Sequence, residues 1–555
     1  MGTSTAYPTP RSRGSSGSGM ADVARSYRLI TFGDSRARAG SVTQIGNTGS
    51  ASTMEPARFG PWCAAMMGDC DIVADFSVGG DTLISSGASS GWNGQSRNNS
   101  KTFANLLALK PDAVLIQYGI NDLPAASSAA LIAAAKSMVS KLVASNIKVL
   151  LQNIMLFDPT AATPNISPAN AAATLVKINA FRDAMTLWMA TLAGRAVFVD
   201  PNPLIALPAT GYGDQQYFGT VDTLGVHPNK IASQLMGKQA ADALRTLLPS
   251  RRARAFTAGP LSQPNLIDWG ASAAANTTVS NSNAGTTTSS PVTWNMDADG
   301  TPYIETTITP TVLASGRALA RVEVWATDIA GATPRHAIFA GDVLQGSARV
   351  VMDDGAGGVA ALQCVNVRQR LYDNASASKF YADWGGISGT DLTLLPMVVD
   401  GRFSTATCVC PIASATIGTP AAGLGYYLGV FVETTALAPI RVRIYAPSLR
   451  VVSRAQPVSV TAGASPYSWT NNPQPFAAND WVNAAGRPVL LTVAPGAGGT
   501  ISQIALTRGP STAGTFTAPV NTGLTQGAFV LMPGDGVIVT WASTAAVLTY
   551  TALDE

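Results

Sequence analysis

Between residues 27 and 248, short apolar runs alternate with longer stretches whose apolar residues recur at helical spacing. The apolar runs predict strands at 28–32, 72–77, 113–118, 148–155 and 196–200. Helical spacing is clearest at 170–192, where apolar side chains return every three or four positions and Gly194 follows as a stop signal. Strands that alternate with helices predict a parallel sheet covered on both faces, with its chemistry just beyond the carboxyl ends of the strands.

The helical spacing disappears after a polar, basic junction at residues 249–254. Short alternating strands then follow, separated by turns rich in Gly, Ser, Thr and Asn, and they predict an antiparallel β-sandwich of the jelly-roll type. From residue 456 the pattern recurs on a smaller scale. We therefore expect a leader at 1–24, an α/β domain at 25–250, a β-sandwich at 251–455 and a small C-terminal β-domain at 456–555.

The composition narrows the class of protein without identifying it. Hydrophobic residues make up 46% of the chain and charged residues 12%, as in folded domains with sparsely charged surfaces. The net charge of +3 gives no reason to expect nucleic acid as a partner, and no apolar run reaches the roughly 18 residues of a membrane span.

Residues 1–24 lack the apolar core of a secretory signal, so we expect a flexible leader, either a native attachment peptide or a linker ending at Met20. Two histidines and no Cys-x-x-Cys pair give no reason to expect a metal site.

Four short segments carry the candidate chemistry, and three of them follow predicted strands. They are Gly33-Asp34-Ser35, Gly79-Gly80-Asp81-Thr82, Gly119-Ile120-Asn121-Asp122 and Gly225-Val226-His227-Pro228-Asn229. A serine on a tight turn after a strand can attack a carbonyl, while glycine N–H groups and an asparagine amide can stabilise the resulting oxyanion. Each segment alone is equally suited to an ordinary turn or helix cap.

His227 is the only histidine before residue 336, so it is the one conventional base available to Ser35 within the α/β domain. A single histidine is often structural. The functional interpretation therefore depends on the four segments occurring together and in this order.

In that order the segments resemble the four sequence blocks of the SGNH (GDSL-type) hydrolase superfamily, over about residues 27–248. The resemblance implies a flavodoxin-like three-layer α/β fold and a serine esterase that needs no metal or organic cofactor. It implies Ser35 as nucleophile, His227 as general base, and an oxyanion hole formed by the Ser35 N–H with Gly80 and Asn121. Asp34 would then be structural.

The sequence departs from the family at the third member of the triad. The family places an aspartate three residues before the histidine, where this chain has Leu224. The nearest acid is Asp222, five residues before His227, and we take it as the expected triad acid. A backbone carbonyl, Asp200 or Asp214 are the alternatives.

The last hundred residues resemble the tip domains of bacteriophage tail fibres and spikes, on residues 502–508 and 531–537. That resemblance implies a virion protein, commonly a homotrimer, that removes acetyl groups from a host surface polysaccharide. The partners would be the acetylated polysaccharide and other virion tail proteins, and the leader would be the attachment end. Aromatic residues scattered through 269–445 could stack on sugars, although core packing explains them equally well. The alternative to a virion protein is an esterase that is secreted or held at the cell surface.

Two other functions stay open. A lipase or thioesterase would act on longer acyl chains and would need a wide apolar groove beside Ser35. A receptor-binding or structural virion protein would keep the hydrolase scaffold without its activity, and Leu224 is the sequence feature that favours this interpretation.

Overall fold

The computed structural model describes three parts of the chain, with gaps. The described residues of the α/β domain are 26–37, 51–54, 58–84, 91–94, 101–218 and 223–250. Those of the middle β-region are 267, 272–281, 285–325, 343–358, 362–372, 378–384, 394–405, 408–409 and 426–453. Those of the C-terminal β-region are 460–461, 480–482, 489–495, 500–507, 520–521, 524, 526–531, 536–542 and 547–552. The predicted leader at 1–24 lies outside them.

The α/β domain contains one parallel sheet of five strands, in the order β3-β1-β4-β5-β6. Its strands are β1 (Tyr27–Gly33), β3 (Cys70–Asp75), β4 (Ala113–Gln117), β5 (Lys148–Gln152) and β6 (Ala196–Val199). All five predicted strands are confirmed, with ends that move by at most three residues. Counted within this sheet the order is 2-1-3-4-5, the flavodoxin-like arrangement.

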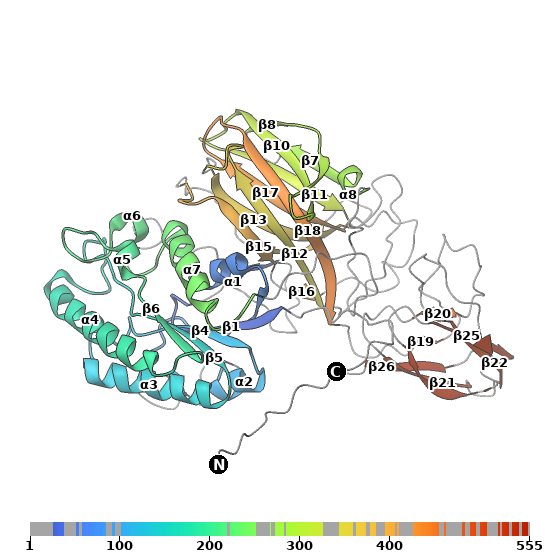
Figure 1. Ribbon diagram of the computed structural model, residues 1–555, viewed down its shortest axis with the longest axis horizontal. Helices are drawn as coiled ribbons and strands as arrows, with labels where there is room; N and C mark the ends of the chain where they lie inside the picture. The colour runs from blue at the N-terminus through green and yellow to red at the C-terminus, as the bar shows by residue number, and fades with distance from the viewer. Residues whose placement is uncertain are drawn as a thin grey trace, which may run out of the picture.

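Helices cover the sheet on both faces (Figure 1). They are α1 (Phe59–Met67), α2 (Phe103–Ala108), α3 (Ser128–Ala144), α4 (Pro168–Ala190), α5 (Asn202–Ile205), α6 (Gln215–Phe218) and α7 (Lys230–Leu244). The long helices α3 and α4 lie together on one face and α1 and α7 on the other. The helix predicted at 170–192 is α4. None of the described helices is both long enough and apolar enough to cross a membrane.

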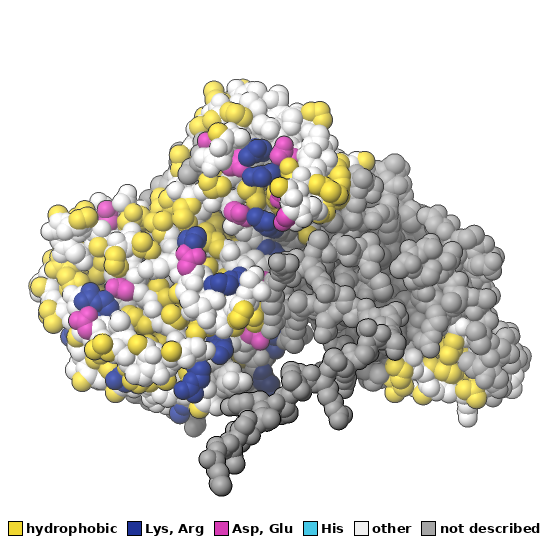
Figure 2. All heavy atoms as spheres, in the orientation of Figure 1, with side chains coloured by type: hydrophobic (Ala, Val, Ile, Leu, Met, Phe, Trp, Pro, Cys, Tyr) yellow, Lys and Arg dark blue, Asp and Glu magenta, His cyan; other side chains and the backbone are white. Residues whose placement is uncertain are grey.

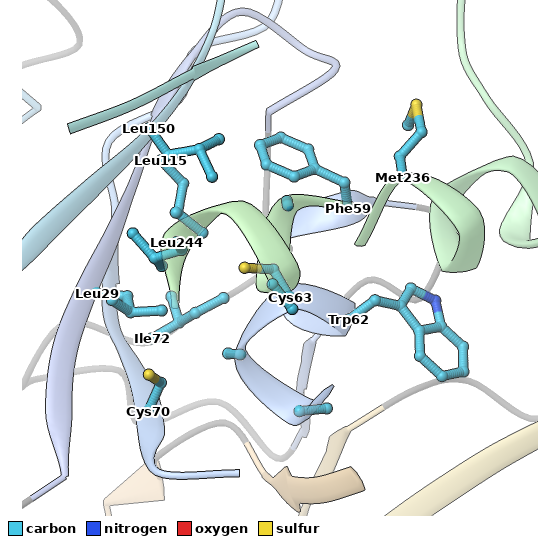
Figure 3. Close-up of a cluster of buried hydrophobic side chains, with 14 of the residues drawn as sticks. Leu29, Phe59, Trp62, Cys63, Cys70, Ile72, Leu115, Leu150, Met236 and Leu244 are labelled. Atoms are coloured by element: carbon cyan, nitrogen blue, oxygen red, sulfur yellow. The ribbon is translucent and has the colours of Figure 1, made fainter. Parts of the chain in front are cut away.

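One part of the domain's core lies between the sheet and the α1–α7 pair (Figure 3). Leu29, Ile72 and Leu115 project from the strands toward Phe59, Cys63 and Leu244 of the two helices, and all are buried. Gly237 of α7 lets the helices approach, because a Cβ at that position would collide with Trp62 of α1.

The middle β-region consists of two sheets. The seven-stranded sheet has the order β15-β12-β18-β10-β8, with β16 paired to β12 and β9 to β10. Its strands are β8 (Thr286–Ser289), β9 (Thr293–Met296), β10 (Pro302–Val312), β12 (Val343–Asp353), β15 (Val399–Ser404), β16 (Cys408–Val409) and β18 (Ile440–Ser453). On the face seen in Figure 2, basic and acidic side chains lie side by side over this region. Ion pairs within the sheet include Arg349–Asp400 and Arg441–Asp353.

The second sheet has six strands in the order β2-β14-β13-β17-β11-β7. Five belong to the middle β-region, β7 (Thr277–Asn281), β11 (Ala318–Trp325), β13 (Leu362–Tyr372), β14 (Ser378–Trp384) and β17 (Tyr426–Thr434), and the short helix α8 (Ser272–Ala275) precedes them. Their pairings are antiparallel, as predicted. The sixth strand, β2 (Ala51–Met54), comes from the α/β domain and pairs in parallel with β14.

The α/β domain and the middle β-region share one buried core. Trp62 of α1 makes edge contacts with Trp384 of β14 and Phe403 of β15, with ring centroids 4.9 and 6.0 Å apart. Asp71 of β3 accepts hydrogen bonds from Arg402 and Ser404 at 3.1 and 2.6 Å. The two parts are therefore packed together, although the sequence pattern treats them as separate domains.

The C-terminal β-region has two four-stranded sheets, β19-β26-β21-β24 and β20-β25-β22-β23. The strands are β19 (Val460–Thr461), β20 (Asp480–Val482), β21 (Val489–Ala494), β22 (Thr500–Thr507), β23 (Val520–Asn521), β24 (Gly527–Leu531), β25 (Gly536–Ala542) and β26 (Val547–Ala552). Its buried side chains form a cluster distinct from the shared core.

Candidate active site

Ser35 and His227 lie 192 positions apart in the sequence and meet at the carboxyl edge of the parallel sheet. Ser35 follows β1, His227 precedes α7, and the Ser35 Oγ lies 2.8 Å from the His227 Nε2. Both residues are half-buried, so the pair can be reached from solvent. This distance lets the imidazole accept the hydroxyl proton.

The turn that carries Ser35 is held on both sides. The carbonyl oxygen of Ser35 accepts a hydrogen bond from Arg58 Nε at 3.0 Å, and the next backbone N–H, of Arg36, donates to Asp34 Oδ1 at 2.9 Å. The Asp34 N–H donates to the carbonyl of Gln117 at the end of β4. The peptide that follows the serine therefore has a fixed orientation.

Beneath this turn, Asp34 and Arg36 are buried together. The Arg36 guanidinium donates to the carbonyl oxygens of Met155 and Leu156, at 2.8 and 3.2 Å. Burial raises the pKa of Asp34 to about 6, although the charge of Arg36 and its N–H act in the opposite direction. Asp34 lies under the serine as part of the turn, in keeping with the structural role that the resemblance implies.

His227 lies in the loop before α7, between two residues, Gly225 and Asn229, that are held by hydrogen bonds. Gly225 has a φ of +64°, and its carbonyl accepts the Asp158 N–H at 2.8 Å. A Cβ at Gly225 would collide with the backbone oxygen of Asp158. Asn229 caps α7 by accepting the N–H groups of Ile231 and Ala232 at 3.0 and 3.1 Å. The ring therefore sits between two constrained positions.

Gly80 and Asn121 come from the loops after β3 and β4. Gly80 is exposed with a φ of +75°, and a Cβ there would meet nothing within 4 Å. The Asn121 side-chain amide donates to the backbone oxygen of Asp81 at 2.8 Å, which orients the amide and leaves its second N–H for another acceptor.

Further residues hold the same two loops, and the sequence pattern gives them no role. The Tyr118 hydroxyl donates to Asp81 Oδ2 at 2.8 Å. The Asp122 carboxylate accepts the N–H groups of Leu83 and Ile84 at 2.7 and 3.0 Å. Burial raises the pKa of Asp122, and the two N–H donors lower it. Asp122 lies within the third candidate segment and Tyr118 directly precedes it, but no sequence signal indicates these contacts, because they join segments about 40 positions apart.

The expected triad acid, Asp222, lies outside the described residues, so its position relative to His227 remains a prediction. The side chain of Leu224 is 40% exposed. Asp200 accepts hydrogen bonds from Asn153 Nδ2 and the N–H of Asn202, and Asp214 accepts two from Gln216. Each of these alternative acids therefore accepts hydrogen bonds from a neighbouring residue.

In the part of the chain that the structure describes, no group of three or more His, Cys, Asp or Glu side chains could hold a metal ion. Cys63 and Cys70 are free and buried in the core. Burial raises the pKa of the Cys63 thiol to about 12, so this thiol stays protonated at neutral pH.

Residues 31–235 match the model of the GDSL-like Lipase/Acylhydrolase family. Similar solved structures include a GDSL-like lipase from Bacteroides thetaiotaomicron VPI-5482, 17% identical, with 40% of this chain and 89% of that chain covered and a TM-score of 0.27. Another is a carbohydrate esterase of family 3 from Talaromyces cellulolyticus, 17% identical, with 39% and 95% covered and a TM-score of 0.24. A third is the psychrotrophic esterase EstA from Pseudoalteromonas sp., 19% identical, with 40% and 98% covered and a TM-score of 0.23. No curated protein matches the chain.

The family match begins within β1 and ends within α7, so it includes all four sequence segments of the site. Within this range lie the five-stranded parallel sheet and the Ser35–His227 pair. Residues 31–235 are therefore similar to acylhydrolase domains of the GDSL (SGNH) type.

Proposed function

We propose that this domain is a serine esterase that forms an acyl-enzyme on Ser35. The observation that carries the proposal is the 2.8 Å contact between Ser35 Oγ and His227 Nε2. Ser35 attacks the ester carbonyl while His227 takes the hydroxyl proton, and His227 then gives that proton to the departing alcohol. Water, deprotonated by His227, then attacks the acyl-enzyme, and His227 returns that proton to Ser35 Oγ as the acid leaves.

The oxyanion would be stabilised by the N–H groups of Ser35 and Gly80 and by the Asn121 amide. The Asn121 contact with Asp81 supports this role, because it uses one amide hydrogen and directs the other. A fixed donor needs no reorganisation when charge develops on the oxygen. Asp222 would orient the imidazole as the third triad member.

For the substrate we propose an acetylated surface polysaccharide. The exposed Gly80 loop, with open space beside it, supports access by a bulky polymer. Additional β-regions on the same chain would raise the effective concentration of a repeating ligand if they bind it.

The likeness of the C-terminal residues to phage tail modules supports a homotrimeric tail fibre or spike protein in contact with other tail proteins. In solution, such a trimer would have three times the chain mass of 57.1 kDa.

The test is acetate release from p-nitrophenyl acetate and from acetylated polysaccharide, for the wild-type protein and Ser35→Ala. We expect release by the wild type, and its loss in a folded Ser35→Ala variant. Equal release by both proteins, or none by either, would contradict the esterase.

A second candidate is a virion protein that binds a receptor and has no activity, which Leu224 favours because it replaces the family's aspartate. This candidate predicts that neither protein releases acetate while the wild type still binds the polysaccharide. A lipase or thioesterase would instead prefer p-nitrophenyl esters of long acyl chains to the acetate.

A further inference from the structure

Strand β2 (Ala51–Met54) is an α/β-domain segment built into a sheet of the middle β-region. It pairs in parallel with β14, in the register Ala51 to Tyr381 and Met54 to Trp384. The other described pairings of that sheet are antiparallel. Strand β2, which lies between Ser35 and α1 in the sequence, is therefore fixed to the middle β-region by backbone pairing.

Arg58 follows β2 by four residues and stands at the N-cap of α1. Four residues span at most about 14 Å, so the position of β2 limits where Arg58 can lie. Trp384 lies next to residues that precede and follow Arg58 in the sequence. It stands opposite Met54, four residues before Arg58, and its ring packs on Trp62, four residues after it.

The Arg58 side chain then reaches the site, because its Nε donates to the carbonyl oxygen of Ser35 at 3.0 Å. The same peptide is held at its N–H end by Asp34. A hydrogen bond from a charged donor is stronger than one between neutral groups. Holding both ends of this peptide restricts rotation about the Cα–C bond of Ser35 (ψ), the torsion that relates the peptide plane to the direction of the side chain.

From these contacts we infer that Arg58 is a positioning residue for the nucleophile and that the middle β-region holds Arg58 in place through β2 and Trp384. The middle β-region then contributes to catalysis without touching the substrate. This inference rests on the proposed esterase function of Ser35.

The first test compares Arg58→Ala and Arg58→Lys in the full chain, with p-nitrophenyl acetate as substrate. A misplacement of 1 Å at a reacting group can cost about 10²-fold in rate. We expect kcat to fall about 10- to 100-fold in Arg58→Ala while KM stays within about twofold, and Arg58→Lys to recover part of the loss. The rate of Ser35 labelling by a fluorophosphonate should fall in parallel.

The second test breaks the pairing of β2 with Ser52→Pro/Thr53→Pro, since proline removes the backbone N–H. The matched control is Arg402→Ala, which removes the ion pair with Asp71 between the same two parts of the chain and leaves β2 intact. We expect the proline variant to lose kcat as Arg58→Ala does, and the control to keep it. Adding Arg58→Ala to the proline variant should cause little further loss, because both changes act on one contact.

The inference is overturned if folded Arg58→Ala keeps kcat within about twofold, or if Arg402→Ala loses as much activity as the proline variant. If Arg58→Ala does not fold, Arg58→Lys and the proline variant decide the question on the same criteria. A wild-type protein that neither hydrolyses the ester nor reacts with the fluorophosphonate would refute the esterase itself. An active wild type with unaffected variants would refute only the role of Arg58.

Discussion

The Asn121 side-chain amide is bonded to the backbone oxygen of Asp81 at 2.8 Å, and this contact joins the loops that follow β3 and β4. The two residues are 40 positions apart, yet the contact fixes the direction of the Asn121 amide. Asp81 is itself held by the Tyr118 hydroxyl. The proposed oxyanion donor is therefore oriented before any substrate arrives.

Asn121→Ala removes this donor and should lower kcat by about 10²–10³-fold, because the oxyanion loses one preorganised hydrogen bond. The measurement is steady-state hydrolysis of p-nitrophenyl acetate. Asn105→Ala, at an exposed position of α2, is the control and should stay within about twofold of wild type. Unchanged kcat in Asn121→Ala would remove Asn121 from the oxyanion hole.

Asp222→Asn tests the proposed triad acid. Loss of the orienting carboxylate should lower kcat by as much as about 10⁴-fold, because the imidazole loses its preferred tautomer and the partner of its cationic form. Asp214→Asn is the matched control, since Asp214 accepts hydrogen bonds from Gln216 instead. Equal activity in the two variants would show that another group orients His227.

Gly225→Ala should disturb the loop that presents His227. A left-handed conformation costs an L-residue about 1–2 kcal/mol, and the new Cβ would also collide with the Asp158 backbone. We expect lower thermal stability and a fall in kcat of more than about tenfold. Gly211→Ala carries the same conformational cost at a φ of +74°, but its nearest contact is 3.7 Å away, so kcat should be retained. Equal kcat values would exclude the loop effect.

The raised pKa of Asp34 predicts that the free energy of unfolding depends on pH. Its pKa is raised by burial from 3.8 to about 6, so it favours the folded state while protonated. Its contribution is complete below about pH 3.8 and is lost as the pH rises through about 6. Asn at this position cannot ionise, so the stability of Asp34→Asn relative to wild type should rise between about pH 4 and 7, by up to about 3 kcal/mol. Urea unfolding of both proteins across this range measures the difference, and a constant difference would contradict the raised pKa.

The sequence predicted the parts of the structure that depend on local pattern. The five strands of the parallel sheet were recognisable because each is a continuous apolar run. The pairing of Ser35 with His227 was expected because the order of the four segments resembles that of the SGNH hydrolases and because His227 is the only histidine in the α/β domain. The jelly-roll type of the middle β-region and the domain boundaries stay predictions.

Contacts between distant segments could not be predicted in this way. Strand β2 is four residues long, and its partner β14 lies more than 320 positions further along the chain. Arg58 belongs to no motif, and its contact with Ser35 follows from how α1 is placed. Local periodicity could not predict the packing of Trp62 on Trp384 either. The sequence pattern around a buried tryptophan is the same whether it packs within one domain or between two.

The packing of Trp62 against Trp384 and Phe403 also limits how such a chain can be reshuffled during evolution. A genetic crossover near residue 250 would join half of one core to an unrelated partner and leave a large aromatic side chain uncovered. The C-terminal β-region has its own core, so a crossover between residues 453 and 460 would separate two intact units. In related genes, we therefore expect the α/β domain and the middle β-region to be inherited together, while the C-terminal β-region is exchanged independently.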